Sequence, residues 1–226
     1  MTIELVVFDI AGTTVVDNGN INEAFRNAFS NAGYEVAPKD VDTVMGYRKI
    51  DAIKIILDQY DIPPGISTNL VEIIHNDFTA NMVRFYHEDK DLKALPFAEE
   101  VFEQLQNMDI KVALNTGFTR VITNEILDRL GWRRSGLINV VVCSDEVPEG
   151  RPHAYMIKNI MEQLDIDDSQ KVAKIGDTKV DIEEGRNANC GLVVAVTTGA
   201  YTKEELLKYQ PDYIIDSLQQ LPELIK

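Results

Sequence analysis

Five apolar runs recur along the chain, with a weaker sixth near its end, and each run ends in a small or polar residue. Within each run the apolar residues are nearly continuous instead of alternating with polar ones, which is typical of strands covered on both faces of a sheet. The runs are ELVVFDI (4–10), IKVALNTG (110–117), INVVVCSDE (138–146), KVAKIGD (171–177), GLVVAVTTG (191–199) and the weaker DYIIDS (212–217). The pattern therefore predicts buried parallel strands.

Stretches with apolar residues three and four positions apart lie between these runs and predict amphipathic helices. These stretches are residues 97–108, 120–131, 152–164 and 179–188, with helix breaks expected at Gly131 and around Gly185. Strands that alternate with helices predict an α/β fold, in which right-handed crossovers place a parallel sheet between two helical layers.

Residues 19 to 90 contain helical patterns with no strand pattern among them. The expected helices are residues 21–34, 41–60 and 69–88, separated by APKD (37–40) and DIPPGIST (61–68). We interpret the interval as a helical insertion placed directly after the first strand. The predicted division is an α/β core at residues 1–16 and 92–226 and a helical domain at residues 17–91.

The charge balance of the chain bears on its partners. The 226 residues contain 22 basic and 37 acidic residues, a formal net charge of -15. This charge disfavours binding to nucleic acid or to an anionic membrane surface. No run of about eighteen apolar residues and no basic, apolar leader segment occurs, so a cytoplasmic protein without a membrane span is expected. Cys143 and Cys190 lie in apolar contexts and are expected to be reduced core thiols.

Polar residues follow the apolar runs where a parallel sheet binds its ligands, at the carboxyl ends of the strands. Asp9 ends the first run, and GDTKVD places Asp177 and Asp181 after the fourth. Clustered carboxylates raise one another's pKa unless a cation lies among them, and hard oxygen ligands without histidine or thiol fit magnesium. The alternative for GDTKVD alone is a helix cap, since aspartate is a favoured N-cap residue.

A phosphate site is the second prediction for this edge of the sheet. The backbone amides of Gly12 and Thr13, the Thr116 hydroxyl with the Gly117 amide, and the Arg151 guanidinium could surround a tetrahedral anion. The alternative for Arg151 alone is an ordinary surface charge.

These residues resemble the haloacid dehalogenase (HAD) superfamily of phosphotransferases, whose four motifs are similar to DIAGTT, NTG, Arg151 and GDTKVD in order and spacing. The resemblance implies a HAD-like (Rossmann-like) core with an inserted helical cap. It implies Asp9 as the nucleophile that forms an aspartyl-phosphate. It further implies Mg²⁺ held by Asp9, the Ala11 carbonyl and Asp177, with Asp181 supporting the outer shell.

Ala11 stands where phosphatases of the superfamily usually have an aspartic acid that protonates the leaving group. The chain is similar here to the phosphonatase-like branch, the phosphonoacetaldehyde hydrolases and their relatives, which carry Asp-x-Ala-Gly-Thr and an arginine in the third motif. The resemblance implies that Lys49, which follows Met45 and Gly46, forms a Schiff base that accepts the electrons of a breaking carbon–phosphorus bond. The alternative for Lys49 is a solvated surface charge.

Three departures from that branch concern substrate chemistry. Ala52 stands where a histidine follows the cap lysine, Phe118 stands where a tyrosine is common, and a cysteine after the first motif is missing. The leading prediction is a magnesium-dependent hydrolase of a small phosphonate, and the main alternative is a phosphatase of small phosphate monoesters. A metal-independent dehalogenase and a non-catalytic phosphate-sensing module are the further alternatives.

The helical insertion raises two further expectations. It is tethered near residues 15–20 and 88–95 and could open and close over the site. Its apolar faces could pack within the insertion or against a second chain in a homodimer, and packing within the insertion is the expectation. These faces contain Phe25, Phe29, Ile53 and Leu57.

Overall fold

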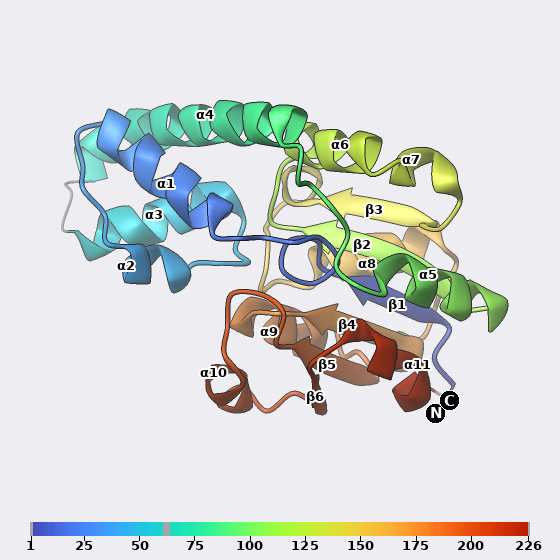
Figure 1. Ribbon diagram of the computed structural model, residues 1–226. Helices are drawn as coiled ribbons and strands as arrows, with labels where there is room; N and C mark the ends of the chain where they lie inside the picture. The colour runs from blue at the N-terminus through green and yellow to red at the C-terminus, as the bar shows by residue number, and fades with distance from the viewer. Residues whose placement is uncertain (1, 61–63, 226) are drawn as a thin grey trace.

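The computed structural model describes residues 2–60 and 64–225, and its centre is a six-stranded parallel sheet with strand order β3-β2-β1-β4-β5-β6 (Figure 1). The strands are β1 (Leu5–Phe8), β2 (Lys111–Thr116), β3 (Val140–Cys143), β4 (Val172–Gly176), β5 (Leu192–Val196) and β6 (Tyr213–Ile215). Every apolar run of the sequence, including the weak sixth, contains one of these strands. The predicted α/β fold is confirmed.

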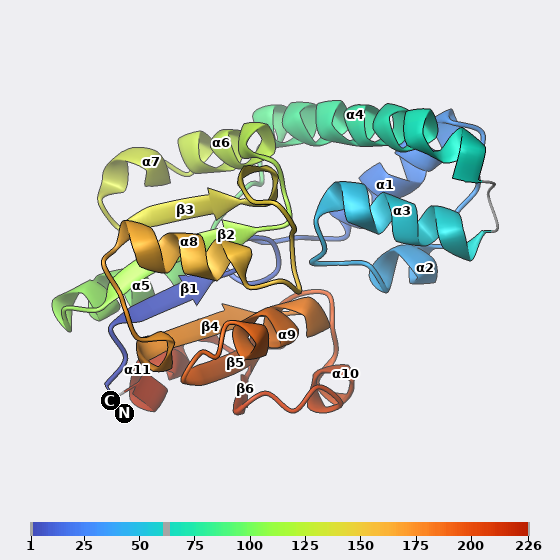
Figure 2. The same cartoon turned by 180° about the vertical axis from the view of Figure 1, so that it is seen from behind.

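Both faces of the sheet are buried, which explains why its strands read as continuous apolar runs. In β1, Val6 and Phe8 belong to one apolar cluster, whereas Leu5 and Val7 belong to the other. Helices α5 (Ala98–Asn107), α6 (Arg120–Arg129), α7 (Trp132–Ser135) and α11 (Leu221–Ile225) contribute to the first cluster. Helices α8 (Tyr155–Gln163), α9 (Lys179–Asn187) and α10 (Lys203–Leu207) contribute to the second, and Figure 2 shows α8 and α9 on that face.

Helices α1 (Asn20–Asn31), α2 (Pro38–Asp42), α3 (Lys49–Gln59) and α4 (Pro64–Glu88) lie between β1 and α5 in the chain. Figure 1 shows them beside the carboxyl ends of the strands, and we call this helical group the cap. Phe25, Phe29, Ile53 and Leu57 are buried there, and the Phe25 and Phe78 rings lie 4.4 Å apart. The apolar faces therefore pack within the insertion, as expected. The exact division at residues 17 and 91 stays a prediction.

The helix expected over residues 41–60 is wrong, because the chain breaks between α2 and α3. Gly46 lies in this break with φ of 84°, in the left-handed region that side chains disfavour. A Cβ atom at Gly46 would also collide with the Thr178 hydroxyl. The break lets the segment before α3 approach the core closely.

Two other helix boundaries differ from the expectation. Gly185 lies inside α9, where a Cβ atom would come within 2.8 Å of Val193, so this glycine allows close helix–sheet packing instead of ending the helix. Helix α4 begins at Pro64, inside the stretch expected to separate two helices, and the first part of that stretch, residues 61–63, lies outside the described residues. Gly131 does end α6, with φ of 71°.

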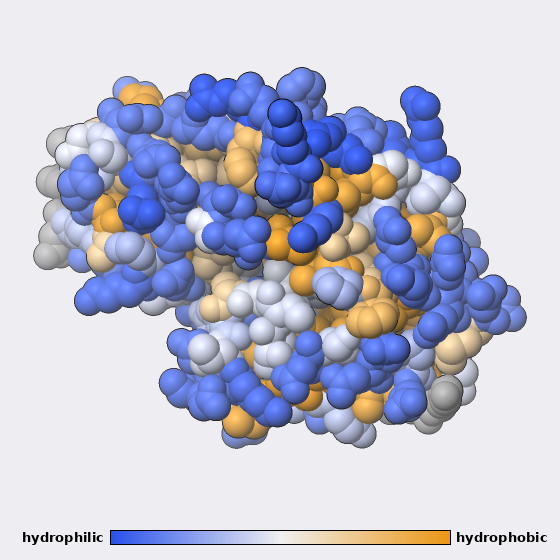
Figure 3. Space-filling view, in the orientation of Figure 1, coloured by the Kyte–Doolittle hydropathy of each residue, from blue (hydrophilic) through white to orange (hydrophobic). Residues whose placement is uncertain are grey.

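The surface of the molecule is mainly hydrophilic on the face shown in Figure 3, and its two cysteines are buried and unpaired as expected. Cys143 and Cys190 are both free and buried, and burial raises the pKa of each thiol to about 12. Within residues 2–60 and 64–225, no helix has the length and apolar character needed to cross a membrane.

Candidate active site

A small cavity of about 20 Å³ lies between the carboxyl ends of the central strands and the cap. Six of the residues predicted from the sequence line it: Asp9, Ala11, Lys49, Thr116, Gly117 and Asp177. Ile21, Met45 and Phe118 add apolar walls. A cavity of this size has room for about one water molecule, so the cap is closed over the site.

Asp9 extends β1 by one residue, and its amide donates to the Ile175 carbonyl of the neighbouring strand at 2.9 Å. Its side chain is 7% exposed. Arg151 Nη1 donates to Asp9 Oδ1 at 2.6 Å, and among the described residues this is the only side-chain donor to the carboxylate. Burial raises the pKa of Asp9, and the Arg151 charge partly offsets this rise. The second oxygen, Oδ2, is left for another partner.

Arg151 is fully buried and is therefore not a surface charge. Besides Asp9, it contacts Asp181 Oδ1 at 3.0 Å and Glu184 Oε2 at 3.1 Å, and its Nη2 donates to the Asn115 carbonyl at 2.7 Å. Burial opposes the charged guanidinium, but Asp181, Asp9 and Glu184 outweigh it and raise the pKa of Arg151. Arg151 is thus held beside Asp9 in its charged form.

Lys174 is a second buried cation of this cluster. Its Nζ lies 2.9 Å from Asp181 Oδ1 and 3.5 Å from Glu184 Oε2, and it donates to Asn115 Oδ1 at 2.8 Å. We call Arg151, Lys174, Asp181, Glu184 and Asn115 the inner network. Its two cations and two carboxylates contact one another directly, as buried charges require.

Sequence reasoning missed Lys174, Glu184 and Asn115, although two signals were present. A lysine in the middle of the apolar run KVAKIGD must be buried, and a buried lysine needs a partner. Glu184 follows Asp181 by three residues, so both carboxylates share one face of α9.

Asp181 has a double role in the structure. Its Oδ2 accepts a hydrogen bond from the Thr178 amide at 3.2 Å, in the capping box that begins α9, and another from the Thr178 hydroxyl at 2.6 Å. Burial alone would raise the pKa of Asp181, but Arg151 and Lys174 outweigh it and hold the pKa below the usual range. Asp181 thus takes part in the capping box as its third helical residue, while the N-cap residue itself is Thr178. Its outer-shell metal role stays a prediction.

Asp177 differs because its partners are uncharged. Thr13 Oγ1 donates to its Oδ1 at 3.1 Å, and the Ala200 amide donates to its Oδ2 at 2.7 Å. Gly12 and Gly199 leave the space that this carboxylate occupies, since a Cβ atom at either would collide with it. Burial, followed by the charges of Asp9 and Asp181, raises the pKa of Asp177 well above its usual range.

A cation beside Asp177 and Asp9 would offset the burial of these carboxylates and the repulsion between them, so the donor set fits magnesium. The buried charges carry one more negative than positive charge when all are ionised: Asp9, Asp177, Asp181 and Glu184 against Lys49, Arg151 and Lys174. Over residues 2–60 and 64–225, no three acidic, histidine or cysteine side chains form a ready metal cluster. Asp9, Asp177 and Ala11 all line the cavity, so two carboxylates and a backbone carbonyl are candidate oxygen ligands there.

The predicted phosphate ligands fall into two groups. Thr116 and Gly117 line the cavity, and Thr116 Oγ1 accepts from the Phe118 amide at 3.1 Å. In contrast, the Gly12 amide donates to the Val15 carbonyl at 2.8 Å, and Thr13 binds Asp177. Gly12 and Thr13 therefore shape the turn that holds Asp177, and their direct contact with phosphate stays a prediction.

Lys49, the first residue of α3, is 4% exposed and is therefore not a solvated surface charge. Its ammonium lies 5.1 Å from the ring centroid of Phe118 and 5.6 Å from that of Phe25. Burial lowers the pKa of Lys49 to about 8, against an opposing effect of Asp9. Ala52, one turn further along α3, is buried and supplies no titratable group.

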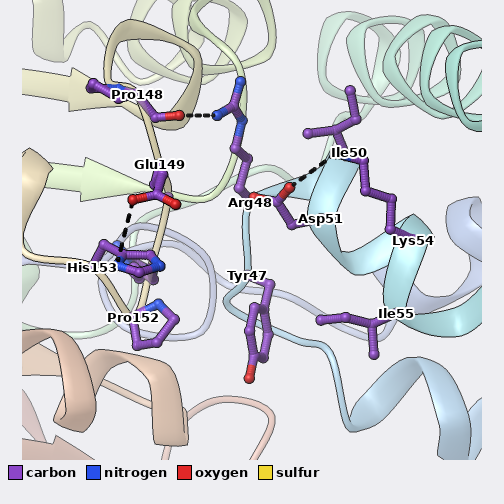
Figure 4. A pocket seen from close by; sticks show the side chains of 12 residues that line it. Tyr47, Arg48, Ile50, Asp51, Lys54, Ile55, Pro148, Glu149, Pro152 and His153 are labelled. Carbon is purple, nitrogen blue, oxygen red and sulfur yellow. Dashed lines mark hydrogen bonds and ion pairs between the residues drawn. The ribbon is translucent and has the colours of Figure 1, made fainter. Parts of the chain in front are cut away.

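Close contacts between cap and core hold Lys49 in this position. Arg48 Nη1 donates to the Pro148 carbonyl at 3.0 Å across a cleft of about 410 Å³ (Figure 4). Gly150 lies against the Arg48 side chain and Gly117 lies against the Tyr47 carbonyl, and neither glycine has room for a Cβ atom. The segment before α3 is therefore fitted directly onto the loop that follows Thr116 and the loop that carries Arg151.

Comparisons with known proteins agree with this geometry. Residues 6–195 match the family model described as haloacid dehalogenase-like hydrolase. A phosphonoacetaldehyde hydrolase of Bacillus mycoides is 31% identical over 93% of this chain and 83% of its own length. One of Bacillus cytotoxicus is 27% identical over 100% of this chain and 96% of its own. The crystal structure of a phosphonoacetaldehyde hydrolase-like protein of Oleispira antarctica shares the fold, with TM-score 0.87, 22% identity and coverage of 100% of this chain and 92% of that one.

Proposed function

Because the chain belongs to the haloacid dehalogenase-like hydrolases, we propose that it cleaves the carbon–phosphorus bond of a small phosphonate, phosphonoacetaldehyde or a relative. Asp9 would attack phosphorus and Lys49 would hold the aldehyde as an imine. One observation carries the proposal. The buried Lys49 shares the cavity of Asp9, while Ala11 occupies the position from which a second carboxylic acid would act.

The lowered pKa of Lys49 suits imine formation, because only the neutral amine attacks a carbonyl carbon. With a pKa of about 8, roughly a tenth of the side chain is neutral at pH 7. An ordinary lysine would be neutral at that pH in well under a thousandth of molecules. The Lys49 nitrogen would add to the aldehyde carbon, and loss of water would leave an iminium.

The iminium supplies the electron sink that a leaving carbanion requires. As an oxygen of Asp9 bonds to phosphorus, the carbon–phosphorus bond breaks, and its electron pair forms the carbon–carbon double bond of an enamine on Lys49. Water then hydrolyses the aspartyl-phosphate to phosphate and Asp9. Protonation of the enamine at carbon and hydrolysis of the imine release acetaldehyde. No alkoxide leaves, so no acid is required at Ala11.

Arg151 supports attack on a charged phosphoryl group. It lies 2.6 Å from Asp9 Oδ1, so a phosphoryl oxygen next to Asp9 would lie within its reach. Asp9, Asp177 and the Ala11 carbonyl would hold magnesium. When bound, magnesium would neutralise the charge that builds up as two anions meet. Thr116 and Gly117 would contact the remaining phosphoryl oxygens.

The closed cavity implies that the cap moves during turnover. A space of about 20 Å³ does not admit a phosphonate, so the cap must open for binding and product release. Closure would then exclude bulk water while Asp9 and Lys49 react. A cap held in one orientation with and without a phosphate analogue in solution scattering would contradict this part of the proposal.

The test is phosphate release from phosphonoacetaldehyde with magnesium, compared between the native protein and Lys49→Ala. We expect release by the native protein and its loss in the variant. Lys54→Ala is the matched control, because Lys54 lies exposed on the same helix and its one ion pair among the described residues is with Asp51 at 3.6 Å. Equal release by the native protein and Lys49→Ala would contradict the imine.

A second candidate is a phosphatase of small phosphate monoesters, with Lys49 binding or protonating the substrate. The apolar surroundings favour it, because Ala52 and Phe118 provide no group to move protons at an imine. A panel of monoesters separates the candidates. Release from monoesters alone that persists in Lys49→Ala would establish the phosphatase, and activity that survives complete chelation would point to a dehalogenase instead.

A further inference from the structure

A second cleft, of about 430 Å³, opens between the cap and the core on the side of α10. It is lined by residues of α2, by the start of α9 and by α10 with its flanking turns. In Figure 3 the surface is notched at this place, between the cap and the lower part of the core. We call it the vestibule.

Three lysines from three different elements line the vestibule: Lys39 of α2, Lys179 of α9 and Lys208 after α10. Within the described part of the chain, none of them forms an ion pair with an acidic side chain. This is unexpected for a protein with a net charge of -15. Lys179 lies over the Tyr47 ring, 5.3 Å from its centroid, a contact that leaves its charge uncompensated. The vestibule therefore contains basic groups without an ion-pair partner on an acidic molecule.

The two carboxylates that line the vestibule are engaged within their own domains. Asp42 Oδ1 accepts a hydrogen bond from Asn22 of the cap at 2.6 Å. Glu205 Oε2 accepts from the Thr202 amide at 2.8 Å and from its hydroxyl at 2.9 Å, in the capping box of α10. Among the residues that the structure describes, neither carboxylate forms an ion pair with a lysine, although the Lys208 charge adds to the Thr202 hydrogen bonds in lowering the pKa of Glu205.

The vestibule adjoins the catalytic cavity along the junction of cap and core. Lys179 follows Thr178, which lines the cavity, and Thr43 of the vestibule lies two residues before Met45 of the cavity. Ala200 lines the vestibule while its amide donates to Asp177. An ion in the vestibule therefore lies beside the junction that must open to admit substrate.

We propose that the vestibule is a capture site for small phosphate or phosphonate dianions, which Lys39, Lys179 and Lys208 attract before the cap opens. The idea rests on the proposed function, because it concerns the substrate of that same site. A protein with net charge -15 repels an anionic substrate at long range. A local cluster of cations in the vestibule attracts the anion at the junction of cap and core, and this raises the rate at which substrate associates with the protein.

The vestibule is much larger than the closed cavity, which supports binding of the anion in the vestibule before it reaches the cavity. The vestibule has room for a hydrated phosphonate, whereas the closed cavity has room for about one water molecule. An anion would bind first in the vestibule and pass into the cavity when the cap moves.

The first test measures binding without turnover. Inorganic phosphate is titrated into nitrogen-15-labelled protein, and the amide signals of Thr43, Tyr201 and Tyr209 are followed, since these residues line the vestibule but not the cavity. We expect saturable shifts in the native protein and their loss in the double variant Lys39→Ala/Lys208→Ala. Unchanged shifts in that variant, or none in the native protein, would overturn the proposal.

Both substituted lysines are exposed, so the variant should fold normally, and the matched control is Lys203→Ala. Lys203 is exposed at the start of α10 but does not line the vestibule. The control should bind phosphate as the native protein does. A loss of shifts in the control as large as in the double variant would show a nonspecific charge effect and overturn the proposal.

The second test uses the substrate that the enzyme turns over. We expect kcat/KM of the double variant to fall about three- to tenfold at low ionic strength, with kcat unchanged, and the difference to vanish in high salt. Equal kcat/KM at low salt would overturn the capture role. If no phosphoryl compound is turned over, the proposed function fails, while the phosphate titration still reports on the vestibule by itself.

Discussion

Asp9 borders two groups of buried charges that differ in how they are compensated. The inner network lies on one side, where each charged group contacts a charge of opposite sign within 3.5 Å. Lys49 and Asp177 line the cavity on the cap side, and among the described residues neither contacts an opposite charge within ion-pair distance. We call Lys49 and Asp177 the cavity pair.

The pKa values record this difference. The pKa of Asp181 in the inner network falls despite its burial, because Arg151 and Lys174 contact it. In the cavity pair, burial dominates, raising the pKa of Asp177 and lowering that of Lys49 to about 8. Charges in ion pairs fix the positions of their side chains, whereas buried charges without an ion pair are available to bind a ligand or to react. The inner network is therefore the support of the site, and the cavity pair is where metal and substrate would bind.

The largest expected effect is the loss of activity on substitution of Asp9, which borders both the inner network and the cavity pair. Asp9→Asn keeps the shape of the side chain but removes the proposed nucleophile, so phosphate release should fall by about 10⁴-fold or more. Measured release under saturating substrate and magnesium checks this. A circular dichroism melt is the control for folding, since the variant loses the ion pair with Arg151. Activity within tenfold of the native protein would contradict a nucleophilic Asp9.

Breaking the inner network should cost stability. Lys174→Met leaves Glu184 and Asp181 with one cation fewer in a fully buried site, and the free energy of unfolding should fall by about 3–5 kcal/mol. Urea unfolding measures the change.

A second substitution sharpens this prediction. Glu184→Gln added to Lys174→Met removes the carboxylate left without its cation, so part of the lost stability should return. A double variant that is less stable than Lys174→Met would show that charge balance is not what Lys174 provides.

Substitution of Lys49 in the cavity pair should raise the stability of the protein, whereas substitution of Lys174 in the inner network should lower it. Lys49→Met removes a buried charge that forms no ion pair among the described residues, so the protein should gain about 2 kcal/mol of unfolding free energy at pH 7 while losing aldehyde-dependent activity. The folded-state pKa of about 8 lies below the unfolded value, so native Lys49 destabilises the fold fully below pH 8. The gain in the variant should therefore fade as the pH rises from 8 toward 10.5. Urea unfolding at pH 7 and pH 10 tests this, and a loss of stability in Lys49→Met at pH 7 would contradict it.

The smallest expected effect concerns the metal. Magnesium at ten times its dissociation constant should stabilise the native protein by about 1.4 kcal/mol. Asp177→Asn should lose this gain while being at least as stable as the native protein without metal, since its carboxylate is buried among neutral donors. Thermal melts with magnesium and with a chelator provide the measurement. A magnesium effect of the same size in Asp177→Asn would place the metal elsewhere.

The sequence predicted the parts of the molecule that follow from local rules. Continuous apolar runs identified all six strands, because both faces of the sheet are covered. The rule that ligands bind at the carboxyl ends of parallel strands brought Asp9, Thr116 and Asp177 to one place. Arg151 was predicted as a phosphate ligand with a surface charge as the alternative, and the structure places it 2.6 Å from Asp9.

The parts that the sequence did not predict depend on contacts between distant segments. The break at Gly46 exists because the cap packs onto Thr178, far away in the chain, and helical periodicity alone continues through it. The amide of Gly12 is free in sequence reasoning but is used by its own turn in the structure. The role of Lys174 emerges only when β4 and α9 place it beside Asp181.

Borohydride trapping tests the central claim, that Lys49 and Asp9 form one site for carbon–phosphorus cleavage, most directly. Phosphonoacetaldehyde and borohydride are added to the native protein and to Asp9→Asn, and the peptides are weighed by mass spectrometry. The account predicts a substrate-dependent adduct on the peptide that contains Lys49. In Asp9→Asn the adduct should keep its phosphonate, since the imine forms but the carbon–phosphorus bond does not break. Phosphate release by the native protein without any adduct on Lys49 would contradict the account.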